Sequence, residues 1–157
     1  MPDVTGPVNA VHIIGGVTVL MADSTIPGHD EGRLAPATLD WITETLSGLA
    51  PDARAVVALH HSPAVIHEPG KEHDGLRHPE ELAALLTGDR RVLAVLTGHK
   101  YVPMAAVFAG RPLLVAPPMT WTGPVADHDR HATALPPQLA LHFIDDRNLA
   151  TQFLVLP

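Results

Sequence analysis

The sequence predicts an α/β fold with mixed sheets and flanking helices. Two nearly continuous apolar runs, residues 54–61 and 91–98, have the composition of strands that are buried on both faces. A short helical pattern at residues 78–88 separates them, and the order strand, loop, helix, strand is that of a parallel crossover unit. Short apolar runs interrupted by Gly and Pro fill the final third of the chain, a pattern typical of antiparallel strands.

The first strands are expected within residues 8–23, where two β-rich runs meet at Gly15 and Gly16. Both glycines can adopt the positive φ angles of a tight hairpin turn. The second run ends at Asp23, for which two roles are open: an acid/base group, or an anchor that accepts hydrogen bonds from the backbone of the following loop. The anchoring role is the one that we expect.

Two segments have the pattern of amphipathic helices. In residues 36–48 apolar side chains recur near helical spacing, Pro36 suits the first turn, and a glycine marks the end. In residues 78–88, Pro79 begins the helix, two acidic residues favour its N-terminus, and Gly88 closes it. These are the flanking helices of the predicted α/β fold.

Loops and a terminal hairpin account for most of the remaining chain. Residues 62–77 are expected to form a polar loop, and residues 117–137 a long loop rich in Pro, Thr and His. The last two apolar runs, residues 138–146 and 149–157, are expected to pair as a hairpin. No shift in composition divides the chain, so residues 1–157 are expected to form a single domain.

Composition excludes several classes of protein. Hydrophobic residues make up 46% of the 157 residues and charged residues only 17%, which favours a folded core over disorder. The net charge of −7 and the lack of a basic cluster argue against binding to nucleic acid or to an anionic membrane. The chain has no cysteine, no apolar stretch of transmembrane length and no signal-peptide pattern at its N-terminus. We therefore expect a soluble, cytoplasmic protein.

Histidines follow both of the buried apolar runs. His60 and His61 end the first run, and His99 ends the second, directly after Gly98. Ligands of parallel α/β sheets gather outside the carboxyl ends of the strands, so these imidazoles converge if the two strands are neighbours. Neutral imidazole is the commonest metal ligand in proteins, and Gly98 is expected to let the backbone turn sharply. The alternative is that the histidines only cap the strands.

Four segments in order resemble a known family. They are "VTVLMADSTIPGHDEGRL", a helix that contains "LDW", "ALHHSP" and "VLTGHKY". Together they resemble the C-terminal half of the calcineurin-like metallophosphoesterases, and most closely the bacterial cyclic-nucleotide phosphodiesterase branch. The resemblance covers residues 8–116 and implies part of a four-layer sandwich domain.

The resemblance implies a metal-dependent phosphoester hydrolase that acts on phosphodiesters or cyclic nucleotides. It implies that His60 and His99 are metal ligands and that His61 lies near the substrate phosphate as a catalytic residue. The cofactors would be divalent metal ions (Mn, Fe or Zn), a dinuclear pair in the family. Two such ions hold a hydroxide that attacks phosphorus and neutralise charge on the phosphate oxygens.

The chain departs from the family pattern in two places. The second histidine of the family's Gly-His-x-His motif is replaced by Tyr101. The N-terminal motifs that supply most of the remaining ligands are not found in their expected places, and no Asn-His pair occurs. His60 and His99 alone fall short of the three protein ligands that a catalytic mononuclear site normally has. Tyr101 and His73 are expected to contact a small phosphoester substrate.

Two functions follow from these observations. In the first, the chain is a phosphodiesterase whose missing N-terminal half comes from an upstream coding segment or from another chain. In the second, it is a noncatalytic, degenerate half-domain that acts as a binding or oligomerisation module. A sheet edge left open by the missing half favours self-association, so a homodimer is expected.

Overall fold

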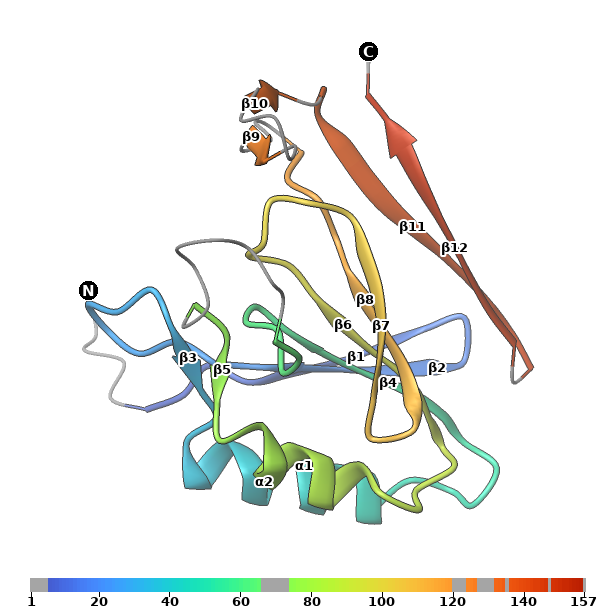
Figure 1. Cartoon of the computed structure of the whole chain (residues 1–157). Coiled ribbons are helices and arrows are strands. Elements are labelled where there is room, and N and C mark those ends of the chain that lie inside the picture. The colour runs from blue at the N-terminus through green and yellow to red at the C-terminus, as the bar shows by residue number, and fades with distance from the viewer. Residues whose placement is uncertain are drawn as a thin grey trace, which may run out of the picture.

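The computed structural model describes residues 6–65, 74–119, 124–126, 132–134, 136–146 and 148–156. A six-stranded mixed sheet forms its centre, and both helices lie on one face of that sheet (Figure 1). The predicted α/β class, with mixed sheets and flanking helices, is therefore confirmed. In the part of the chain that is described, no helix is long and apolar enough to cross a membrane.

The strand order in the central sheet is β1-β2-β4-β6-β8-β7. The inner strands β2, β4, β6 and β8 run parallel, and the edge strands β1 and β7 are antiparallel to their neighbours. All four inner strands therefore end at the same edge of the sheet. The strands are β1 (Ala10–Ile14), β2 (Val17–Ala22), β4 (Arg54–Leu59), β6 (Val92–Thr97), β7 (Met104–Phe108) and β8 (Arg111–Val115).

The two predicted helices form within a few residues of their expected limits, as α1 (Pro36–Ser47) and α2 (Pro79–Leu86). Their apolar faces, which include the fully buried Ile42 and Leu82, pack in one cluster with the sheet. On the sheet side this cluster contains Val57 and Val95 from the neighbouring central strands. Burial of a side chain of this size stabilises the fold by roughly 1.5–3 kcal/mol.

The two terminal runs pair as a hairpin, as expected, with strands β11 (Gln138–Asp145) and β12 (Asn148–Val155). This hairpin covers part of the opposite face of the sheet. Ile144 and Leu149 of this hairpin pack against Val56 and Ala94 of the sheet. Side chains alternate along strand β4, so Val57 packs on the helix side of the sheet and Val56 packs on the hairpin side.

Three expectations about strands are wrong in detail. Strand β8, which was expected to be only antiparallel, pairs parallel with β6 as well as antiparallel with β7. The expected loop at residues 117–137 contains the short pair β9 (Pro124–Ala126) and β10 (Ala132–Ala134). The expected loop at residues 62–77 ends in β5 (Leu76–Arg77), which pairs with β3 (Gly32–Arg33). Strands of two or three residues are too short to show a period in sequence.

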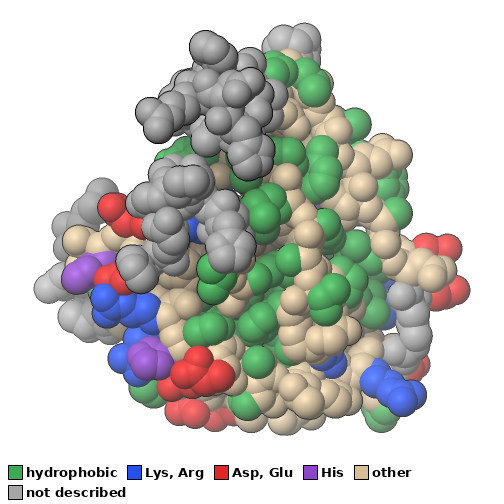
Figure 2. Space-filling model, in the orientation of Figure 1, with side chains coloured by type: hydrophobic (Ala, Val, Ile, Leu, Met, Phe, Trp, Pro, Cys, Tyr) green, Lys and Arg blue, Asp and Glu red, His purple; other side chains and the backbone are tan. Residues whose placement is uncertain are grey.

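Both edges of the central sheet expose apolar side chains. On β1, Ile13 is 76% exposed and Ile14 is 66% exposed, and on β7, Val107 is 75% exposed. Hydrophobic side chains also gather over the middle of the molecular face seen in Figure 2, above the two helices. Open edge strands with apolar side chains are prone to pair with another chain.

Candidate functional site

The parallel pairing of β4 with β6 brings the predicted histidines together. His60 directly follows β4, and His99 lies two residues beyond β6. The amide of Gly98 donates a hydrogen bond of 3.1 Å to the carbonyl of His60, which continues the ladder past the ends of both strands. The predicted convergence of the two strand ends is confirmed.

His60, His61 and His99 form one compact cluster. Their ring centroids lie 4.8–4.9 Å from one another, and one ligand nitrogen from each ring lies within 4.8 Å of the others. His99 Nδ1 and His60 Nε2 are 3.0 Å apart. Consecutive side chains of a strand point to opposite faces, so His61 continues the helix-facing side of β4 and is buried, whereas His60 is exposed.

His61 is held in place by two residues that follow β2. Ser24 Oγ lies 2.9 Å from His61 Nδ1, and both side chains are almost fully buried. Gly32 packs so closely against the ring that an added Cβ would lie 2.1 Å from Nδ1. The pairing of β3 with β5 fixes Gly32 at this place, since its amide donates to the carbonyl of Gly75.

All three imidazoles favour the neutral form. Burial, together with the positive charge that His60 and His99 can carry, lowers the pKa of His61 to about 4. Burial lowers the pKa of His60. Burial and the positive charges of His60 and Lys100 lower the pKa of His99, and the carboxylates of Asp74 and Asp30 act on it in the opposite direction. At neutral pH the three imidazoles are therefore uncharged, which is the form that binds metals.

These nitrogens fit a divalent ion. Two imidazole nitrogens that bind one ion at about 2.1 Å, at a right angle, lie ~3 Å apart, which is the separation of His60 Nε2 from His99 Nδ1. The anchoring of His61 by Ser24 resembles the outer hydrogen bonds that orient metal-binding histidines. The donor set and its spacing therefore suit a metal centre.

The sharp turn expected at Gly98 lies one residue later. His99 itself adopts a left-handed backbone conformation with φ 71°, as does Tyr101 with φ 53°. An L-residue in this region carries backbone strain of about 1 kcal/mol or more, and such residues occur often at functional sites. A side chain at Gly98 would not be crowded, because an added Cβ would lie 3.9 Å from the ring of His60, an ordinary van der Waals contact.

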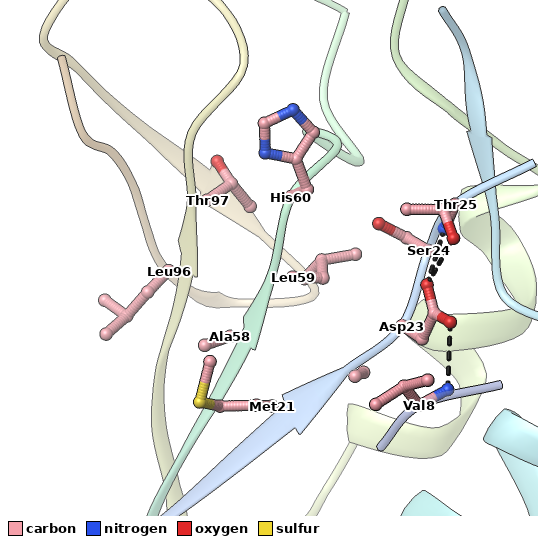
Figure 3. A pocket seen from close by; sticks show the side chains of 11 residues that line it. Val8, Met21, Asp23, Ser24, Thr25, Ala58, Leu59, His60, Leu96 and Thr97 are labelled. Atoms are coloured by element: carbon pink, nitrogen blue, oxygen red, sulfur yellow. Dashed lines mark hydrogen bonds between the residues drawn. The ribbon is translucent and has the colours of Figure 1, made fainter. Parts of the chain in front are cut away.

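Asp23 anchors the loop after β2, as expected. Its carboxylate accepts hydrogen bonds from the amide and hydroxyl of Thr25 and from the amide of Val8 (Figure 3). Burial raises the pKa of Asp23, but these hydrogen bonds outweigh it and hold the pKa below its usual value. The residue thereby fixes the start of the segment that carries Ser24.

A cavity of about 610 Å³ opens beside the cluster, on the sheet face away from the helices (Figure 3). Its walls are mainly apolar and include Met21, Ala58 and Leu96, with His60 and Thr97 at the strand ends. Among the described residues, the hydroxyl of Thr97 is a buried side-chain oxygen that lacks a hydrogen-bond partner.

The remaining predicted site residues are Tyr101 and His73. Tyr101 lies two residues after His99 and is 41% exposed. His73 lies outside the described residues. The roles of Tyr101 in substrate binding and of His61 beside the phosphate stay predictions. Ser24 and Gly32 were not anticipated, because their partner His61 is distant in sequence and only the fold brings them together.

The chain is similar in sequence to bacterial cyclic nucleotide phosphodiesterases. The chain is 36% identical over 116 residues to a probable cyclic nucleotide phosphodiesterase of Rhodococcus erythropolis, which covers 74% of the chain and 38% of that protein. It is 33% identical over 116 residues to a cAMP/cGMP dual specificity phosphodiesterase of Mycobacterium tuberculosis, which covers 74% of the chain and 36% of that protein. The chain thus spans a little over a third of the length of these relatives.

A solved dimetal phosphatase of Danio rerio aligns with 55% of the chain and 27% of its own length, at 18% identity and a TM-score of 0.43. No protein-family model matches the chain.

Gly32→Ala is expected to lower the free energy of unfolding by about 1–3 kcal/mol, because the new methyl group would overlap the ring of His61. Gly98→Ala is the matched control, since its methyl group would be in ordinary contact with His60 and should cost less than about 1 kcal/mol. Urea unfolding of both variants measures the difference. Equal stability of the two variants would contradict the close packing of Gly32.

Protonation of His61 is expected to lower the free energy of unfolding of the metal-free chain by about 2 kcal/mol between pH 7 and pH 5. Its pKa of about 4 in the fold lies below the unfolded value of 6.5, so the unfolded state binds more protons in this range and stability falls as the pH falls. Urea unfolding at both pH values, with chelator present, compares the wild type with His61→Gln. The stability of His61→Gln should lack that part of the pH dependence. The control variant His12→Gln, at an exposed position of β1, should keep the pH dependence of the wild type. Identical profiles for wild type and His61→Gln would refute the assignment.

Proposed function

Because this chain belongs to the calcineurin-like phosphoesterase family, we propose that it supplies one half of a metal-dependent phosphoester hydrolase centre. The substrate class that we propose is a small phosphodiester such as a cyclic nucleotide, because two similar proteins are a probable cyclic nucleotide phosphodiesterase and a cAMP/cGMP dual specificity phosphodiesterase. The observation that carries the proposal is the preformed imidazole cluster at the ends of β4 and β6.

The chain's own residues have three tasks in this proposal. His60 and His99 hold uncharged nitrogens 3.0 Å apart and thereby bind a divalent ion of the Mn, Fe or Zn class. Ser24 fixes the ring of His61, and Asp23 holds the loop that carries Ser24. When bound, such an ion supplies positive charge to the phosphate oxygens and lowers the pKa of a bound water. The apolar cavity beside His60 lies where a substrate would enter.

Full activity requires more ligands than the described cluster offers. Within the described residues, three imidazoles lie within ligand distance of one another, and carboxylates are not part of that group. A two-ion centre needs a second set of ligands, mainly oxygens for hard divalent ions. We propose that this set comes from a further segment of the same polypeptide or from another chain, which docks on the open face of the sheet as part of one domain with residues 1–157.

The hydrolase proposal predicts Mn²⁺-dependent cleavage of cyclic AMP or of bis(4-nitrophenyl) phosphate. The assay compares the 157-residue chain with a form extended through any in-frame coding segment before Met1. We expect the extended form to be the more active, and His99→Ala in it to lower kcat/KM by about 100-fold or more because one ligand is lost. His12→Ala is the control, since His12 is exposed on β1. Cleavage that is absent from both forms, or unaffected by His99→Ala, would refute the proposal.

A second candidate function is that of an oligomerisation module, and the exposed apolar edges favour it. Ile13 and Val107 expose three quarters of their surface on opposite edge strands of the sheet. Such edges pair with a second copy when nothing else covers them.

This candidate predicts a dimer or larger assembly of the 157-residue chain at tens of micromolar, measured by light scattering. Ile13→Lys should shift the chain towards the monomer, because a charged side chain on an edge strand opposes pairing. Thr43→Lys, on the exposed surface of α1, adds the same charge and should leave the assembly unchanged. A monomeric wild type would refute this candidate.

A further inference from the structure

We propose that a second pocket of this chain binds the phosphate or carboxylate group of a small anionic ligand, through Lys100 and Arg77. Among the described residues, this pocket shares none of its walls with the cavity beside His60, and the three clustered histidines do not line it. Binding of such an anion requires neither a metal nor the cleavage of a phosphoester, so it goes beyond the proposed hydrolase function.

The pocket has a volume of about 480 Å³ and lies beyond the carboxyl ends of β4 and β6, next to the start of α2. A volume of this size is within the range of roughly 300–1,000 Å³ that is usual for small-molecule sites. Its walls come from the segment before β3, the segment after His61, strand β5, the start of α2 and the turn after β6. The described lining residues are Glu31, Ser62, Pro63, Ala64, Val65, Gly75, Leu76, Arg77, Pro79 and Lys100.

Lys100 supplies a positive charge at the inner wall. The residue is 2% exposed, although lysine is almost never buried to this extent unless its charge is compensated. The ammonium group has three N–H donors and no acceptor. A hydrogen bond within the protein therefore still leaves donors for a ligand oxygen in the pocket. A buried lysine at a pocket wall suits an anionic ligand better than a neutral or a cationic one.

Arg77 supplies a second set of donors, in a position fixed by Glu31. The Arg77 guanidinium donates a hydrogen bond to the Glu31 carboxylate, and His29 Nδ1 lies 3.3 Å from the same carboxylate oxygen. The side chain of Arg77 is half exposed, whereas that of Glu31 is largely buried. A guanidinium has five N–H donors in a planar fork that matches carboxylate and phosphate oxygens. Its pairing with Glu31 thus orients Arg77 and leaves donors for an anion.

The balance of charge in the pocket favours an anion. The pair of Arg77 with Glu31 is neutral as a unit, so the charge of Lys100 remains in excess among the described walls. The net charge of the whole chain is −7, and an anion would therefore be held by this local positive charge rather than by a general attraction. Charges interact more strongly beside protein walls than in bulk water.

The uncharged walls leave the choice of ligand to the two cations. The hydroxyl of Ser62 is already bonded to the carbonyl and to the amide of Ala64, and the carbonyl of Ser62 accepts from the amide of Leu76. Most of the other walls are apolar and suit a compact carbon skeleton. The ligand class that fits is a small molecule with one phosphate or carboxylate group.

The test is titration of the 157-residue chain, freed of metals on a chelating resin and kept in Tris buffer, with inorganic phosphate and separately with acetate. Binding is followed in ¹H–¹⁵N NMR spectra of the wild type. We expect saturable shifts of the amides of Ala64, Gly75 and Leu76, while the amide of Gly15 in the distant β1–β2 turn stays unchanged. Saturation by phosphate alone identifies a phosphate ligand, and saturation by acetate alone a carboxylate ligand. Shifts that do not saturate, or that centre on His60 and His99, would overturn the proposal.

A matched pair of variants isolates the role of Arg77. Arg77→Gln should weaken anion binding by about 10-fold, because a charge-assisted hydrogen bond is lost. Arg33→Gln is the control: Arg33 is the partner of Arg77 in the β3–β5 register and is exposed, but it does not line the pocket. It removes the same charge nearby and should bind as the wild type does. Equal affinities of the two variants would overturn the proposal.

Lys100→Met removes the buried ammonium and should weaken anion binding by about 10-fold or more. Urea unfolding shows whether this variant is folded, and the exposed Arg77 pair decides the matter if it is not. A folded Lys100→Met that binds phosphate and acetate as the wild type does would contradict the role of Lys100. Anion binding at this pocket by a chain that cleaves no phosphoester would support the proposal and count against the hydrolase function alone.

Discussion

The hydrogen bond from the Gly98 amide to the His60 carbonyl links the ends of two parallel strands, and the rest of the site depends on that link. Parallel pairing places the carboxyl ends of β4 and β6 side by side, so residues 39 positions apart in the sequence come within 3.0 Å. In an antiparallel pair the same two histidines would lie at opposite ends of the strands. The crossover through α2, buried by Leu82 and Leu86, is what makes the parallel arrangement possible.

A second layer of structure turns two converging histidines into a cluster of three. His61 is the next residue after His60 and would point away from it in a regular strand. The chain bends after β4, and Ser24 and Gly32 from the segment after β2 close over the ring of His61. The sheet therefore sets the position of the site, and the loop after β2 sets its shape.

The central strands, both helices and the histidines of the candidate site could be predicted from the sequence. Long apolar runs and helix patterns with proline at the start gave β4, β6, α1 and α2 nearly to their observed limits, and the strand ends gave His60, His61 and His99 as site candidates. Asp23 was also predicted as a loop anchor, because an aspartate at such a turn binds the backbone two residues on. These signals are all local in the chain.

Contacts between distant segments could not be predicted in this way. The pair β3–β5 has only two residues in each strand, yet it holds Gly32 against His61, and neither residue carries a signal of that contact. The sequence predicts the sharp turn at Gly98, because glycine is the usual residue for positive φ, but the structure has it at His99. The parallel pairing of β8 with β6 likewise depends on the sheet order, which periodicity does not encode.

The imidazoles of His60 and His99 meet at the end of a parallel strand pair, at a spacing that suits one divalent ion. The most direct measurement is the zinc K-edge X-ray absorption spectrum of the 157-residue chain loaded with one equivalent of Zn²⁺. We expect a first shell of nitrogen and oxygen at about 2.0–2.1 Å with the outer-shell scattering of at least two imidazoles. Scattering from one imidazole or none, with the rest of the shell made by water, would contradict the assignment of His60 and His99 as ligands.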